Sequence, residues 1–63
     1  MSGTSYREII RMLERDGWFL VAAVGSHRQF KHPEKPGKVT VPHPRRVLAP
    51  KTIKSILRQA GLL

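Results

Sequence analysis

Cysteine is absent from this chain of 63 residues. The absence excludes a disulfide scaffold, a cysteine-based zinc site and a thiol nucleophile, and it fits a reducing cytoplasm. Long apolar runs are also missing, so the sequence contains neither a membrane-spanning helix nor the apolar block of a signal peptide. We therefore expect a cytoplasmic protein, with binding of the basic, amphipathic N-terminal segment to a membrane surface as a minor alternative.

Acidic residues are the second shortage, with 4 Asp and Glu against 12 Lys and Arg and a formal net charge of +8. Two-metal phosphoryl transfer needs a cluster of carboxylates, and three of the four acids here fall within residues 8–16. The spacing of His27, His32 and His43 matches no compact zinc motif. The composition predicts no metal site and a polyanionic partner, with nucleic acid first and an acidic protein second.

The length allows one domain, which we assign to residues 1–63. A domain of this size buries only about 60% of the surface that its unfolded chain exposes. It can build one modest core and one working surface, and it has no room for a separate cofactor-binding domain. We therefore expect the protein to work without a cofactor.

Two segments predict helices, at residues 5–16 and 50–60. In the first, Ser5 and Glu8 have the spacing of a capping box and Gly17 is the expected end. In the second, Pro50 suits the first turn. Apolar residues recur with helical spacing in both, at Tyr6, Ile9, Ile10 and Leu13 and at Ile53, Ile56, Leu57 and Ala60.

Three segments predict β-strands, at residues 18–24, 27–32 and 38–41. Gly25-Ser26 predicts a hairpin turn between the first two, and residues 33–37 predict a loop. The first segment, WFLVAAV, shows no clean alternation, which favours a strand covered on both faces. Trp18 is expected to be a core anchor where the first helix meets the sheet, with stacking on a base as the alternative.

The order of these elements is α-β-β-β-α, which predicts an α+β fold: a three-stranded antiparallel sheet with both helices on one face. Phe30 must face the core because it is the one large apolar residue of its strand. Alternation then puts His27, Gln29 and Lys31 on the open face and Arg28 on the core side. On the third strand the outward residues are Lys38 and Thr40. The same element order occurs in double-stranded RNA-binding domains, although fold analogy alone says little about function.

Several motifs resemble, closely and in order, the HicA family of toxins. They are D-G-W after the first helix, G-S-H at the hairpin, F-K-H-P, V-P-H and the closing I-L-R-Q-A-G-L, and they extend from about Glu8 to Leu62. The resemblance implies a toxin of a type II toxin–antitoxin pair that cleaves mRNA independently of the ribosome. It also implies a HicB-like antitoxin that covers the active site. Lys51-Thr52 stands where many relatives have Gly-Thr, which we expect to affect only the helix start.

The resemblance also implies that His27, in the G-S-H motif, is the catalytic residue. Histidine gives and takes protons near neutral pH, and RNA supplies its own nucleophile, the 2′-OH. The group that protonates the leaving oxygen stays open among His32, His43, Lys31 and water. His32 is expected mainly to cap the strand end beside Pro33, and His43 to be mainly a structural or antitoxin-contacting residue. We predict RNA contacts from Gly25, Ser26, Arg28, Gln29, Lys31, Lys38, Arg45 and Arg46.

Two other classes of function stay open at this point. One is a non-catalytic RNA-binding module of the same fold. The other is a domain that uses its charge to recognise an acidic protein.

Overall fold

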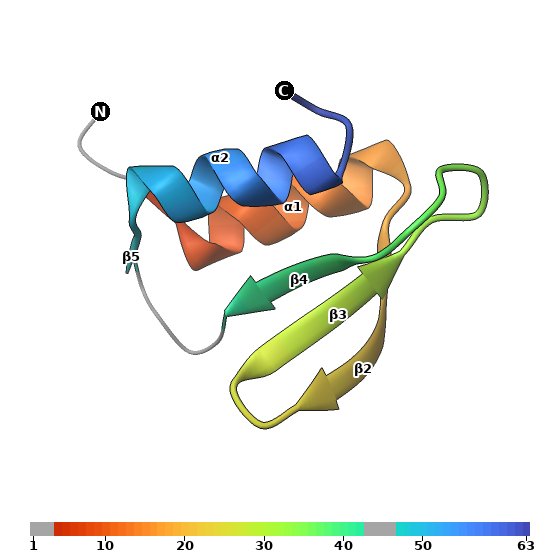
Figure 1. Ribbon diagram of the computed structural model, residues 1–63, viewed down its shortest axis with the longest axis horizontal. Coiled ribbons are helices and arrows are strands. Elements are labelled where there is room, and N and C mark those ends of the chain that lie inside the picture. Colours follow the sequence, from red (N-terminus) through yellow and green to blue (C-terminus); the bar gives the residue numbers. More distant parts are fainter. Residues whose placement is uncertain (1–3, 43–46) are drawn as a thin grey trace.

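Both helices lie on the same face of a three-stranded antiparallel sheet (Figure 1), which confirms the predicted α+β class. The computed structural model describes residues 4–42 and 47–63. The elements are β1 (Thr4–Ser5), α1 (Tyr6–Asp16), β2 (Phe19–Val24), β3 (His27–Lys31), β4 (Val39–Pro42), β5 (Val47–Leu48) and α2 (Pro50–Gln59). The strand order is β2-β3-β4. Each predicted helix and strand is therefore present, with its ends shifted by no more than one residue.

The sequence did not predict the short strands β1 and β5. They pair antiparallel, with Thr4 opposite Leu48 and Ser5 opposite Val47, and they join the chain just before α1 to the chain just before α2. Two residues are too few to produce a periodic pattern. Leu48 is buried, so this pairing brings a further side chain into the core.

The first helix begins and ends as its sequence predicts. The Ser5 side chain accepts a hydrogen bond from the Glu8 backbone, and the Glu8 side chain accepts one from the Ser5 backbone, which completes the capping box. At the other end Gly17 has a φ of 106°, and its N–H donates to the last carbonyls of the helix. Ile9 and Leu13 are buried on the inner side of the helix.

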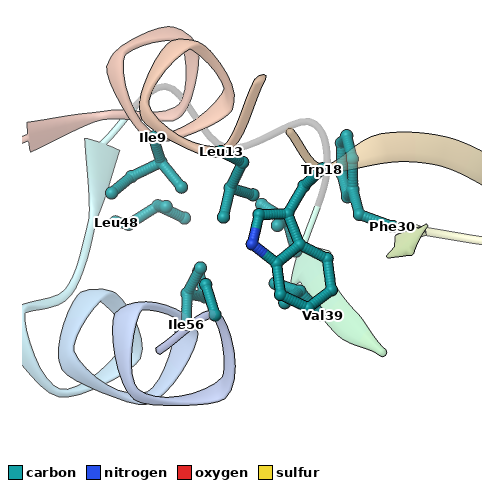
Figure 2. Packing of buried hydrophobic residues seen from close by; sticks show 9 residues of the cluster. Ile9, Leu13, Trp18, Phe30, Val39, Leu48 and Ile56 are labelled. Carbon is teal, nitrogen blue, oxygen red and sulfur yellow. The ribbon is translucent and has the colours of Figure 1, made fainter. Parts of the chain in front are cut away.

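The core lies between the two helices and the inner face of β3 and β4 (Figure 2). Trp18 is only 2% exposed, which confirms it as the core anchor and leaves its ring no surface on which to stack a base. Its Nε1 donates to Asp16 Oδ2 at 3.2 Å. The buried set is Ile9, Leu13, Trp18, Phe30, Val39, Val41, Leu48, Ile56 and Ala60.

The expectation that β2 is covered on both faces is wrong. All six of its residues are exposed or half-buried. The strand order explains this, because β4 lies next to the helices and β2 lies at the far edge, away from them (Figure 1). The register between β2 and β3 also shifts between Leu20 and Ala22, which places a β-bulge at Val21.

A group of side chains joins α1, β3 and α2 at one end of the molecule, and we call it the Asp16 junction (Asp16, Gly17, His32, Lys35 and Ala60). Lys35 Nζ donates to Asp16 Oδ2 at 2.5 Å and to the Ala60 carbonyl at 3.0 Å. This hydrogen bond and charge from Lys35 lower the pKa of the Asp16 carboxyl below its ordinary value, against a smaller opposing effect of desolvation. One lysine therefore ties the ends of both helices together.

His32 occupies the centre of the Asp16 junction. Its Nδ1 accepts hydrogen bonds from the backbone N–H groups of Glu34 and Lys35, at 3.0 and 2.9 Å. The ring proton must then sit on Nε2, which donates to the Asp16 carbonyl at 2.6 Å. The ring meets Trp18 edge-on, with centroids 5.2 Å apart. These bonds confirm that His32 caps the end of its strand beside Pro33.

Gly17→Ala should destabilise the protein more than Gly25→Ala. Both glycines have positive φ, which costs an alanine about 1–2 kcal/mol. A Cβ on Gly17 would also lie 2.8 Å from His32 Nε2, whereas a Cβ on Gly25 would meet nothing within 4 Å. Displacing His32 adds about 1 kcal/mol for a lost hydrogen bond. Urea denaturation should give a loss of about 2–3 kcal/mol for Gly17→Ala and about 1–2 kcal/mol for Gly25→Ala. Equal losses would contradict this account of Gly17.

Lys35→Met should destabilise the protein at neutral pH and matter less in acid. The pKa of Asp16 is lower in the folded chain than in the unfolded chain. The ionised pair therefore stabilises the fold above about pH 4, and this contribution is lost as the pH falls through the folded-state pKa. Denaturation of the wild type and Lys35→Met at several pH values should show their difference shrinking towards low pH. Lys54→Met, at an exposed lysine of α2, is the control and should show no such trend.

Candidate functional site

The open face of the sheet, the side turned away from the helices, carries the outward residues of β3 and β4. In the observed register His27 lies opposite Pro42, and Gln29 lies opposite Thr40. Facing residues of an antiparallel pair project to the same side, and Phe30, between Gln29 and Lys31, is buried on the other side. The structure therefore places His27, Gln29 and Lys31 together on the open face, as the alternation of the sequence predicts.

The hairpin turn sets the position of His27. Gly25 has a φ of 57°, and among the described residues only glycines have positive φ, so the pair Gly25-Ser26 has the backbone signs of a type II′ turn. His27 is the first residue of β3 after this turn and pairs with Val24 of β2. Its side chain is exposed. An imidazole is thus presented at a rigid corner of the sheet with open space around the neighbouring turn.

Lys31 and Lys38 mark the opposite end of the open face. Lys31 is the last residue of β3, and Lys38 precedes Val39, whose partner is Phe30. Both lysines are exposed. A strand rises about 3.4 Å per residue, so Lys31 is about 14 Å along β3 from His27. The two ammonium groups and the imidazole can therefore contact different parts of one extended ligand.

The remaining predicted contact residues divide between two other locations. Arg28 is half-buried and lies opposite Val41, so it belongs to the core side of β3, as the alternation implied, and does not share the face of His27. His43, Arg45 and Arg46 lie outside the described residues. Pro42, one residue beyond the predicted strand 38–41, is the last residue of β4 and the cross-strand neighbour of His27.

A groove of about 370 Å³ runs between β4 and α2, and sequence reasoning did not find it. It is lined by Thr40, Pro42, Lys51, Thr52, Ser55, Ile56 and Gln59. Because Thr40 and Pro42 also face Gln29 and His27, the groove continues the open face towards α2. The shape of the groove depends on the distance between α2 and β4, and no local sequence pattern indicates that distance.

Gln59 lines this groove and is bonded to β4. Its Oε1 accepts a hydrogen bond from the Thr40 backbone N–H at 3.1 Å, and its Nε2 donates to Ser55 Oγ at 3.2 Å. A side chain of α2 thus accepts a hydrogen bond from a backbone N–H at the outer edge of β4. Lys51, in the first turn of α2, brings a positive charge to the groove.

The described residues, 4–42 and 47–63, contain no group of three His, Asp or Glu side chains arranged to hold a metal ion. Within the same residues no helix is both long and apolar enough to cross a membrane.

A comparison with protein families finds a match to the family described as the HicA toxin of bacterial toxin–antitoxin systems. The match covers residues 6–62 and confirms the resemblance seen in the motifs. The comparison with curated proteins gives no match.

His27→Ala and His32→Ala should differ in stability, although both remove an imidazole from the same strand region. His32→Ala deletes three hydrogen bonds of the Asp16 junction and should lower the free energy of unfolding by about 1–3 kcal/mol. His27 is exposed, so its replacement should change stability by less than about 0.5 kcal/mol. Urea denaturation with a circular-dichroism readout measures both. A large loss for His27→Ala would mean that His27 has a structural role.

Proposed function

Because the chain belongs to the HicA family of toxins of bacterial toxin–antitoxin systems, we propose that it is an endoribonuclease. In this proposal it cleaves mRNA independently of the ribosome and without a metal or other cofactor, and His27 is the catalytic acid–base group. The observation that carries the proposal is the position of His27, exposed on the open face at the corner of the β2–β3 hairpin.

The reaction that suits this site uses the nucleophile of the RNA itself. His27 removes the proton of a 2′-OH, and the 2′-oxygen forms a bond to the adjacent phosphorus. The bond from phosphorus to the 5′-oxygen of the next nucleotide breaks, and that oxygen takes up a proton. The products are a 2′,3′-cyclic phosphate and a 5′-hydroxyl, so atoms and charge balance. Proton transfer of this kind contributes typically about 10²–10⁴-fold to a rate.

The geometry bears on which group supplies the proton to the leaving oxygen. His32 has both ring nitrogens engaged in the Asp16 junction, and it follows Lys31 at the far end of β3. Lys31 is about 14 Å along the strand from His27, so it would reach the same phosphodiester only with its side chain extended towards His27. Water, and His43, which directly follows Pro42 in the chain, are the donors that the proposal favours.

The cations of the open face suit binding of the RNA backbone beyond the scissile bond. Lys31 and Lys38 are exposed at the end of the face opposite His27, and Lys51 stands in the adjoining groove. Positive charge along the path of the RNA backbone neutralises phosphates and strengthens binding. In this proposal Gly25 and Ser26 lie beside the scissile nucleotide, Gln29 contacts the RNA along the face, and Arg45 and Arg46 make further phosphate contacts. Arg28 lies on the core side of β3, so the proposal does not include it.

The proposal also includes inhibition by a HicB-like antitoxin. A nuclease that cuts cellular RNA needs an inactive state, and an antitoxin laid over the open face would hide His27. Its carboxylates would pair with Lys31 and Lys38, which are exposed. Complementary charge of this kind speeds association and excludes wrong partners. RNA and antitoxin would then compete for one surface.

His27→Ala should lower the rate of RNA cleavage by at least about 10²-fold while the protein keeps its folded circular-dichroism spectrum. The assay uses purified protein and single-stranded RNA in EDTA, and it detects the 2′,3′-cyclic phosphate end. Lys54→Ala, which removes an exposed side chain of α2, is the control and should cleave at the wild-type rate.

Two results would overturn the proposal. If the folded His27→Ala protein cleaves at a near-normal rate, His27 is not catalytic. If the wild type binds the RNA but leaves it intact, the chain is the RNA-binding module considered above.

A further inference from the structure

β2 is an unprotected, apolar edge of the sheet. Its six residues, FLVAAV, carry neither a charge nor a proline. Four large side chains are exposed to a degree that is unusual for their type: Phe19 (50%), Leu20 (47%), Val21 (46%) and Val24 (62%). β3 pairs with one side of β2, and the other side is the outer edge of the sheet (Figure 1). Such an edge presents backbone N–H and C=O groups to any chain that can pair with it.

The opposite edge of the same sheet is protected. The Thr40 backbone N–H of β4 donates to Gln59 Oε1 of α2, and β4 ends in Pro42, which has no N–H to offer. Natural proteins block sheet edges with such devices because open edges pair with other chains. β2 has one irregularity, the bulge at Val21, and beyond it Ala22–Val24 pair regularly with β3. The contrast between the edges indicates that β2 is kept open for a partner.

Charge decides what kind of partner fits. The hairpin and its flanks, residues 17–33, contain no Asp or Glu but do contain Arg28 and Lys31. A second copy of this chain would bring two such hairpins together, each in a molecule of net charge +8, and like charges repel. A strand with apolar residues for β2 and carboxylates for the cations of β3 meets no such penalty.

We propose that the β2 edge is the docking site for a β-strand of the acidic antitoxin, which extends the sheet to four strands. This inference rests on the proposed function, since that function supplies the antitoxin. Strand addition obtains affinity from main-chain hydrogen bonds and from contacts of alternate side chains. The exposed side chains of Phe19 and Val24 would supply those contacts on the open face, where they lie opposite Lys31 and His27.

Docking at β2 would also bring the antitoxin to the catalytic residue. Val24 pairs with His27, and neighbouring strands lie about 4.8 Å apart. A strand added outside β2 would therefore run about 10 Å from β3. The chain that leaves this strand needs to cross only β2 to cover His27. The apolar edge would hold the antitoxin, and its carboxylates would reach the cations of the open face.

Hydrogen–deuterium exchange tests this placement directly. The probe is the HicB-like antitoxin that restores growth to cells expressing the toxin, mixed with the His27→Ala protein so that the sample is not toxic to its host. Backbone amides of Phe19–Val24 should gain protection in the complex. Unchanged exchange in β2, with protection gained elsewhere on the toxin, would overturn the proposal.

A matched pair of variants measures the energetic role of the edge. Val21→Glu puts a carboxylate on the β2 edge, and Leu63→Glu puts the same charge on a residue that is 67% exposed at the C-terminus. The dissociation constant of the antitoxin should rise at least about tenfold for Val21→Glu, as expected for loss of an important interface contact. It should change less than about threefold for Leu63→Glu. Equal effects of both variants would overturn the proposal.

Two further measurements separate this proposal from its alternatives. If sedimentation shows the toxin alone forming a dimer that Val21→Glu dissociates, the occupant of the edge is a second copy and the proposal is wrong. RNA cleavage by the Val21→Glu toxin alone should match the wild type, because Val21 is not part of the RNA site proposed above. Weak antitoxin binding together with normal cleavage supports docking at β2. Absence of cleavage by the wild type would overturn the proposed function, while the exchange experiment would still report on docking.

Discussion

The fold depends on the hydrogen bonds of the Asp16 junction. Lys35 donates to the carboxylate of Asp16, the last residue of α1, and to the carbonyl of Ala60, which follows α2. His32 bonds the Asp16 carbonyl and two backbone N–H groups of its own loop. A chain of this length buries only about 60% of the surface that its unfolded state exposes, so packing alone leaves a small margin of stability. The junction fixes the far end of β3, and His27 at the near end is positioned along the same strand. The D-G-W and F-K-H-P motifs supply Asp16 and His32 to this junction, so both motifs have a structural role.

The two edge strands of the sheet differ in how well they are covered. α2 packs beside β4, and Gln59 occupies a backbone donor of that strand. Nothing comparable is seen at β2 in the described residues, and its apolar side chains are exposed. Two helices of 11 and 10 residues cover the sheet near β4 but do not reach its β2 edge (Figure 1). β2 therefore stays exposed and available to a partner chain.

The sequence predicted what depends on local periodicity and missed what depends on the arrangement of elements. Both helices and the three long strands follow from apolar spacing, and the open-face position of His27 follows from Phe30 and the alternation of a strand. WFLVAAV misled because an all-apolar strand reads the same whether it is central or at an edge, and only the strand order decides. β1 and β5 are two residues each, too short for a pattern. The groove beside α2 arises from packing, which leaves no trace in the local sequence of Lys51 or Ser55.

His27 and His32 show how little residue type alone says about role. Both belong to the HRQFKH segment, and both are polar residues in a strand region. His32 has both ring nitrogens engaged with three backbone partners, so its imidazole is committed to the fold. His27 is exposed beside a turn and takes no part in the Asp16 junction, so its imidazole is open to a ligand. In this fold the histidine that holds the structure together and the histidine proposed to act in catalysis are different residues.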